Sequence, residues 1–278
     1  MSKFLNMHEL DKIHEAVGYI RSLYTGKIDS AVILGSGLGS FSEEIVVELS
    51  IPYSEIPHFP VSTVEGHGGH LLIGNLSGKG VLVMSGRFHF YEGYGPTEVV
   101  FPIRVLHLLG IQNLFVSNAA GGVNPDFKVG DLMVIKDHIS LSIVNPLLGK
   151  NLDELGPRFP DMSEPYSKSF IQQAFAIAEK EGYTLKQGVY FGVTGPTFET
   201  RAEYKMIHIL GADAVGMSTV QEVIAAVHCG MKVFAMSVIT DLGIREEENI
   251  ITHQEVLDAA NAAAPKLSAI FKQLIIAS

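Results

Sequence analysis

The chain has 278 residues, of which 47% are hydrophobic and 18% charged, so it is long enough to bury a large core. Its formal net charge of −10 disfavours a broad surface for nucleic acid or an anionic membrane, and we expect neither as a partner, although a pocket for a small anion remains compatible with it. The single cysteine, Cys229, excludes an intramolecular disulfide and a cysteine-rich zinc site. The N-terminal residues lack a signal-peptide pattern and no apolar run is long enough to span a bilayer, so we expect a cytoplasmic protein.

Apolar residues recur at helical spacing over positions 10–24, which predicts an amphipathic helix that ends near Gly26. Further along, short apolar runs typical of buried strands alternate with helical patterns. The predicted strands are residues 31–34, 81–84, 114–116, 132–135, 189–193 and 233–239, and the predicted helices are 96–109, 167–181 and 219–229. Thr252 and Glu255 form a capping box for a last helix, which contains Pro265. This alternation predicts an α/β fold with a mostly parallel or mixed central sheet.

The segment that follows strand 81–84 concentrates chemically active side chains. If this segment is extended, the alternate residues Arg87, His89 and Tyr91 share one face and converge on one ligand. An edge strand with a solvated polar face is the alternative. The presence of all three residues between glycines favours a site.

Small or polar residues follow most of the predicted strands. Because ligands of open α/β sheets bind at the carboxyl ends of the strands, we expect these segments to line one crevice. The segments are residues 35–39, 118–122, 194–200, 218–219 and 240–241.

Several of these groups suit a phosphate. Glycines 35, 37 and 39 lack the spacing of a dinucleotide fingerprint and the lysine of a P-loop, but they allow backbone amides to approach an anion beside the Ser36 hydroxyl. Ser218 or Thr219 is the expected N-cap of the next helix and gives a second anion contact. No third ligand accompanies His67 and His70, so we expect a site without metal.

Six motifs occur in an order that makes the chain resemble purine nucleoside phosphorylases of the homotrimeric, low-molecular-mass type over nearly its whole length. The motifs are residues 35–39, 67–71, 86–93, 118–122, 195–200 and 211–219. The resemblance implies one nucleoside phosphorylase domain over residues 1–278, with a mixed, partly barrel-like central sheet flanked by helices. It also implies reversible phosphorolysis of purine nucleosides in purine salvage, with orthophosphate as co-substrate and no cofactor.

The resemblance further implies roles for individual residues, four of which are catalytic: His89, Glu92, Glu199 and Asp241. Phosphate would be held by Ser36, His67, Arg87, His89, the backbone of Ala119, and Ser218. The purine would contact Phe198, Glu199, Val215 and Asp241. The ribose would contact Tyr91, Phe159, Met217 and His253.

Asp241 departs from the family pattern, which commonly has asparagine after the threonine of that strand-end motif. An ionised aspartate only accepts hydrogen bonds, whereas asparagine also donates, so adenosine-type substrates become conceivable. We still expect inosine and guanosine to lead, because Glu199 suits a purine N1–H that adenine lacks.

The irregular stretch 144–165 contains four prolines and is too long for an ordinary connection. By resemblance, it carries Phe159 into the site of a neighbouring subunit of a trimer. Three other functions stay open: a 5'-methylthioadenosine phosphorylase, a non-catalytic nucleoside sensor and a dinucleotide oxidoreductase. His253 disfavours the first, the intact Arg87 and His89 set disfavours the second, and the glycine spacing disfavours the third.

Overall fold

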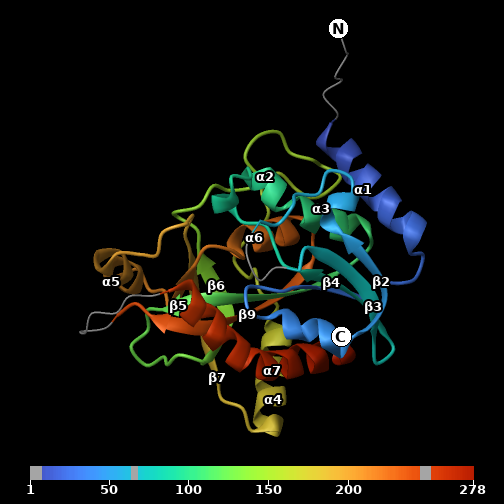
Figure 1. Cartoon of the computed structure of the whole chain (residues 1–278). Coiled ribbons are helices and arrows are strands. Elements are labelled where there is room, and N and C mark those ends of the chain that lie inside the picture. Colours follow the sequence, from blue (N-terminus) through green and yellow to red (C-terminus); the bar gives the residue numbers. More distant parts are fainter. Residues whose placement is uncertain (1–7, 64–67, 245–251) are drawn as a thin grey trace.

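The computed structural model describes residues 8–63, 68–244 and 252–278 (Figure 1). These residues form nine strands, seven α-helices and three short 3-10 helices. The strands are β1 (Ser30–Ile33), β2 (Val46–Pro52), β3 (His70–Leu76), β4 (Lys79–Ser85), β5 (Asn113–Gly122), β6 (Leu132–Ile139), β7 (Leu185–Gly192), β8 (Ala214–Gly216) and β9 (Lys232–Leu242). The α-helices are α1 (Glu9–Leu23), α2 (Pro96–Val99), α3 (Phe101–Leu108), α4 (Lys168–Glu181), α5 (Arg201–Ile209), α6 (Val220–His228) and α7 (His253–Ala277).

The strands form one mixed sheet in the order β2-β3-β4-β1-β5-β8-β7-β6-β9. Strand β9 also pairs in parallel with β5, so the last five strands of this order close into a barrel. Pairings β1–β4, β1–β5, β6–β7 and β7–β8 are parallel, whereas β2–β3, β3–β4, β5–β8 and β6–β9 are antiparallel. The predicted mixed and partly barrel-like α/β fold is therefore confirmed.

Helices cover both faces of the sheet. Figure 1 shows α1, α3 and α6 on one side and α4 and α7 on the other. Strand β1 packs against the helices on both faces of the sheet, because its successive side chains point to opposite faces. Ala31 and Ile33 pack in the cluster that contains residues of α1 and α3, while Val32 packs in the cluster that contains residues of α7. A strand buried on both faces needs a continuous apolar run, which is the pattern that predicted it.

Most of the elements predicted from the sequence are present. The six predicted strands lie within or across β1, β4, β5, β6, β7 and β9, and the helices predicted at the N-terminus, at 167–181, at 219–229 and after Thr252 correspond to α1, α4, α6 and α7. The predicted helix 96–109 is divided at Val100 into α2 and α3, where Pro102 stands at the start of the second helix. Helix α7 has the predicted capping box and continues through Pro265.

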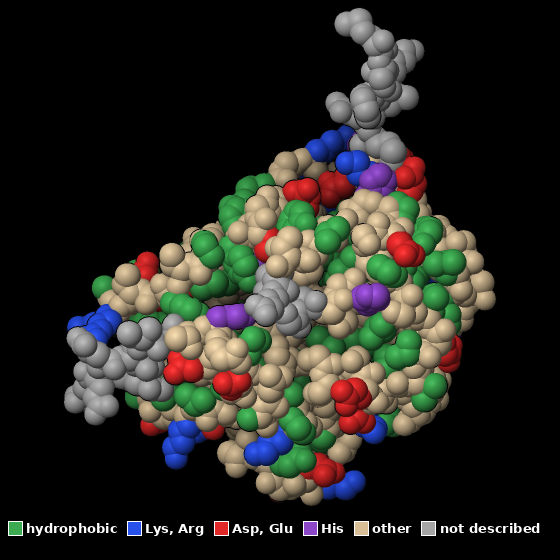
Figure 2. Space-filling model, viewed as in Figure 1, with side chains coloured by type: hydrophobic (Ala, Val, Ile, Leu, Met, Phe, Trp, Pro, Cys, Tyr) green, Lys and Arg blue, Asp and Glu red, His purple; other side chains and the backbone are tan. Residues whose placement is uncertain are grey.

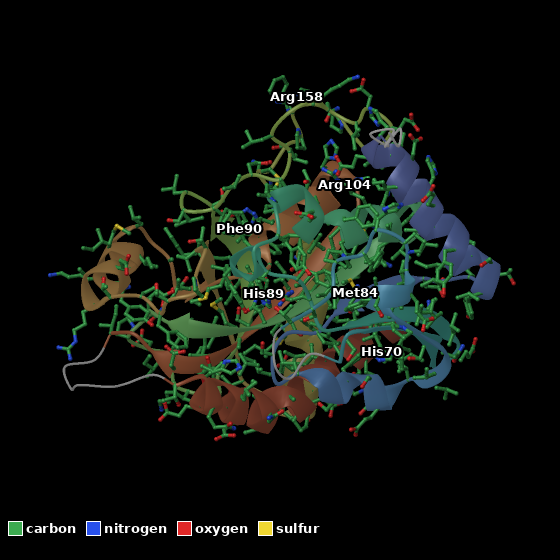
Figure 3. The ribbon with its side chains drawn as sticks, turned by 45° about the horizontal axis from the view of Figure 1, so that its top comes forward. His70, Met84, His89, Phe90, Arg104 and Arg158 are labelled. Atoms are coloured by element: carbon green, nitrogen blue, oxygen red, sulfur yellow. The ribbon has the colours of Figure 1, made fainter. Side chains whose placement is uncertain are left out.

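A long connection between β6 and α4, residues 140–167, contains no helix or strand. Helix α6 anchors it at two points: Gln221 Nε2 donates to the carbonyl of Val144 at 2.8 Å, and His228 Nε2 lies 3.1 Å from Asn151 Oδ1. Arg158 lies at the outer edge of this connection (Figure 3). The connection is thus fixed to the protein along one flank and presents its other flank outward.

Candidate active site

A cavity of about 400 Å³ lies where the segments after β1 and β4 meet the ends of β5, β8 and β9. Its walls come from strand ends, from the segment 196–199 and from the start of α7. Most of the residues predicted for the site line this one cavity: Ser36, Arg87, His89, Tyr91, Ala119, Phe198, Glu199, Val215, Met217, Ser218, Asp241 and His253. The prediction that the strand-end segments share a crevice is therefore correct.

Two of the described residues that were predicted for the site do not line the cavity. Glu92 lies behind His89, against its imidazole. Phe159 projects from the connection 140–167 with 86% of its surface exposed, and the guanidinium of Arg158 lies over its ring at 5.3 Å. His67 lies outside the residues that the structure describes.

Arg87 is the central cation of the cavity. It follows β4 after Gly86, which has a φ of 103°, and only 1% of its surface is exposed. Its Nη1 donates to the carbonyl of Ser117 at 2.6 Å and to Ser218 Oγ at 3.3 Å. The guanidinium is thus fixed beside a hydroxyl at the cavity wall, an arrangement suited to a tetrahedral oxyanion.

The expected extended run from Arg87 to Tyr91 is wrong, although its three side chains do converge. Residues Phe90–Glu92 form a 3-10 turn because Glu92 folds back and accepts the backbone N–H of His89 at 2.8 Å. The turn stacks the rings of His89 and Tyr91 with centroids 4.6 Å apart and planes 17° apart. His89 lies near the middle of the molecule (Figure 3).

The environment of His89 favours the neutral form of its ring. Burial lowers the pKa of His89, and this effect outweighs the opposing influence of Glu92, whose Oε1 lies 2.9 Å from Nδ1. Burial acts to raise the pKa of Glu92, but hydrogen bonds from His89 and Thr63 outweigh it and lower that pKa to about 2. A neutral imidazole that donates Nδ1–H to a carboxylate leaves Nε2 as an acceptor.

Thr219, the residue between Ser218 and α6, has an uncommon backbone conformation. Thr219 has a φ of 71° and a ψ of −51°, which costs a β-branched residue roughly 1–3 kcal/mol. Its side chain does not cap the helix, contrary to expectation, and its Oγ1 accepts from Asn118 Nδ2 at 2.8 Å instead. Strain of this kind persists where the surroundings enforce it, here beside the hydroxyl of Ser218.

Two carboxylates occupy the opposite end of the cavity. Burial raises the pKa of Glu199, and the nearby charge of Asp241 raises it further. Asp241 is 7% exposed, and its Oδ1 accepts from Thr240 Oγ1 at 3.1 Å. Burial also raises the pKa of Tyr204, with both carboxylates contributing. This end is acidic and suits a ligand that donates hydrogen bonds.

Sequence reasoning missed Tyr204 and the position of Glu222, and it placed Asn118 in the crevice without a role of its own. Asn118 and Tyr204 line the cavity, and each is almost fully buried. Glu222 was given no role from the sequence, but its carboxylate is buried against Arg87. The signal for Glu222 was a carboxylate in a strongly apolar helix, since a buried charge requires a partner.

No group of three or more histidine, cysteine or acidic side chains among the described residues is placed to hold a metal ion. None of the described helices has the length and apolar character needed to cross a membrane. On the face drawn in Figure 2, the described charged side chains of both signs are scattered and form no continuous basic surface.

Comparison with known proteins gives one consistent family. The family model of the Phosphorylase superfamily matches residues 11–276. Purine nucleoside phosphorylase 1 of Geobacillus stearothermophilus is 50% identical over 246 residues, which are 88% of this chain and 90% of that protein. The crystal structure of Schistosoma mansoni purine nucleoside phosphorylase in complex with adenosine matches with a TM-score of 0.91 and 40% identity over 96% of each chain. A schistosoma purine nucleoside phosphorylase in complex with hypoxanthine matches with the same values.

Proposed function

The chain belongs to the phosphorylase superfamily, and we propose from its cavity that it catalyses the reversible phosphorolysis of purine nucleosides. Orthophosphate attacks the anomeric carbon of the pentose, the glycosidic bond breaks, and a free purine and a pentose 1-phosphate leave. The observation that carries this function is the polarity of the cavity, which has a buried guanidinium and a serine hydroxyl at one end and two carboxylates at the other. The reaction uses orthophosphate as co-substrate and requires no cofactor.

The phosphate binds at the Arg87 end. The Arg87 guanidinium and the hydroxyls of Ser36 and Ser218 donate to its oxygens, together with the backbone N–H of Ala119. The lone pair on His89 Nε2 accepts a hydrogen bond from a protonated phosphate oxygen, because Glu92 holds the proton on Nδ1. His67 remains a prediction for this subsite.

The relative positions of the phosphate and the pentose in the cavity account for the acceleration of phosphorolysis. As the glycosidic bond lengthens, the pentose gains positive charge while the phosphate retains negative charge directly beneath it. This attraction is stronger in the transition state than in the ground state, so holding the phosphate in place lowers the barrier. The stacked rings of His89 and Tyr91, with Met217 and His253, form the wall that would face the pentose.

The purine binds at the acidic end. Glu199 accepts N1–H of a 6-oxopurine, with Phe198 and Val215 packing on the ring. Asp241 lines the same end of the cavity, where it faces the leaving base and accepts hydrogen bonds from it. Inosine and guanosine are therefore the leading substrates, with adenosine as the weaker one.

We also propose that the enzyme is a homotrimer in which Phe159 covers the pentose of a neighbouring subunit. Four large apolar side chains on the connection between β6 and α4 are exposed: Leu141 at 79%, Val144 at 37%, Leu148 at 67% and Phe159 at 86%. Apolar side chains gathered on one segment favour burial against another chain.

A phosphate-dependent assay tests the proposed reaction. Purified protein with inosine and phosphate is expected to release hypoxanthine and ribose 1-phosphate, and a matched sulfonate buffer without phosphate is expected to give no release. Guanosine, adenosine and 5'-methylthioadenosine run in parallel rank the substrates. Equal cleavage without phosphate would identify a hydrolase and refute the proposal.

A further inference from the structure

Glu222 is a buried carboxylate with no place in the chemistry described so far. It lies in the first turn of α6 and does not line the cavity. Its Oε1 accepts from Arg87 Nε at 3.0 Å and its Oε2 accepts from Arg87 Nη2 at 2.8 Å. The side chains of the two residues are 1% and 5% exposed, so this bidentate pair is removed from solvent.

The pair determines how the guanidinium is turned. A guanidinium is planar and presents its N–H groups in a fixed fork. Because Glu222 takes the edge formed by Nε and Nη2, Nη1 is directed the other way, toward the carbonyl of Ser117 and the hydroxyl of Ser218. Turning the guanidinium away from this orientation would break both of its hydrogen bonds to Glu222.

Glu222 and Ser218 are also held in a fixed relation to each other. They flank Thr219, whose φ of 71° sets the start of the helix and whose carbonyl accepts the N–H of Val223 at 2.9 Å. Asn118 fixes Thr219 through its side chain at 2.8 Å. One strained turn therefore places both the hydroxyl that faces the phosphate and the carboxylate that orients the cation.

We propose that Glu222 is a positioning residue of the phosphate subsite, which acts through Arg87 and holds its Nη1 in register with Ser218. This role rests on the proposed phosphorolysis. It predicts a specific pattern: loss of the carboxylate weakens the use of phosphate while the use of nucleoside changes little, because the purine end of the cavity is not touched.

The test is Glu222→Gln, which keeps the size of the side chain but cannot accept two hydrogen bonds from the same edge of Arg87. The phosphate KM and the phosphate Kd from calorimetry are expected to rise about tenfold or more, with the nucleoside KM within about twofold of wild type. The matched control is Glu9→Gln, which removes the partner of a second buried arginine, Arg104, away from the cavity. It is expected to lower the melting temperature and leave the phosphate KM unchanged.

Glu222→Asp covers the case in which the glutamine variant does not fold. Aspartate keeps the charge that neutralises Arg87 but is one methylene shorter, so the protein is expected to fold and the phosphate KM to rise, by a smaller factor. A folded Glu222→Gln or Glu222→Asp protein with wild-type phosphate KM and Kd overturns the proposal. Failure of the proposed reaction looks different, since the wild type would then show no phosphate-dependent cleavage, and the phosphate Kd alone would still decide the role of Glu222.

Discussion

Glu92 holds His89 by both its backbone and its ring: Oε1 accepts the backbone N–H at 2.8 Å and lies 2.9 Å from Nδ1. Its other oxygen accepts the N–H and the hydroxyl of Thr63 at 2.8 and 2.6 Å. One carboxylate thus fixes the turn, the orientation of the imidazole and the position of its proton. Charge-assisted bonds of this kind are the stronger ones in proteins.

Glu92→Gln is expected to lower kcat/KM by about tenfold or more, roughly 1.4 kcal/mol, because a neutral amide holds the Nδ1 proton less firmly and fits the four donors less well. Steady-state kinetics with inosine and phosphate measure the effect. Circular dichroism is the control for folding. Unchanged kinetics in a folded variant would show that the orientation of His89 does not matter for turnover.

Asp241→Asn is expected to raise the preference for inosine over adenosine by about tenfold, roughly 1.4 kcal/mol in the transition state, because the amide donates to a 6-oxo group where an ionised carboxylate only accepts. The ratio of kcat/KM values for the two nucleosides measures it. The phosphate KM serves as the internal control, since Asp241 lies at the other end of the cavity. The same ratio in both proteins would remove Asp241 from base recognition.

Phe159→Ala is expected to raise the nucleoside KM by about tenfold while leaving the melting temperature of the isolated subunit unchanged, because the ring is 86% exposed within its own chain. The matched control is Val46→Ala on β2, another exposed apolar side chain at 72%. Analytical ultracentrifugation gives the assembly state alongside the kinetics. A fully active monomer, or an unaltered nucleoside KM, contradicts the shared site.

Stability is expected to fall as the pH drops below 6.5. Burial lowers the pKa of His89 and of His138 from 6.5, so the folded protein binds fewer protons than the unfolded chain just below that value. Each such histidine therefore stabilises the fold fully above pH 6.5, and this contribution is lost on acidification at up to about 1.4 kcal/mol per pH unit. Burial raises the pKa of Glu199, so this group affects stability in the opposite direction. Its contribution to the stability of the fold is lost as the pH rises above 4.5.

Melting temperatures between pH 5 and 8 check this dependence, with His138→Gln as the informative variant. Glutamine keeps an amide that pairs with the hydroxyl of Tyr166, which lies 3.0 Å from Nδ1 of His138, but it does not titrate. The slope of melting temperature against pH below 6.5 is expected to be shallower than in wild type. An equal slope would exclude His138 as a contributor.

The sequence predicted the fold well where strands are buried on both faces. Val81, Leu82, Val83 and Met84 of β4 are all buried, so an uninterrupted apolar run marks the strand. Strand β2 was not predicted, and its first three residues, Val46 to Glu48, are exposed, so it lacks the continuous burial that marks β4. Helix α5 was missed because it is short and exposes Met206 and Ile209, which blurs its apolar stripe.

The sequence predicted which residues form the site where these residues follow strand ends or match family motifs. It did not predict the contacts between them. Arg87 and Glu222 are 135 positions apart, so their pairing depends on the tertiary fold. Thr219 matched the pattern of a helix cap, but contact with Asn118, 101 positions away, gives its hydroxyl another partner. The turn at Phe90–Glu92 was hidden because alternation of polar side chains also describes a strand.

Helix α6 links the proposed phosphate subsite to the connection between β6 and α4. Ser218, which precedes the N-cap of this helix, lies beside Arg87 at the cavity, while Gln221 and His228 hydrogen-bond with the connection that carries Phe159. Ordering of the phosphate subsite is therefore expected to order the connection between β6 and α4. By thermodynamic linkage, ordering of that connection is expected to favour phosphate binding to the same extent. Phosphate binding is expected to slow amide hydrogen exchange at Val144 and Asn151, and dissociation of the proposed trimer on dilution is expected to weaken phosphate binding.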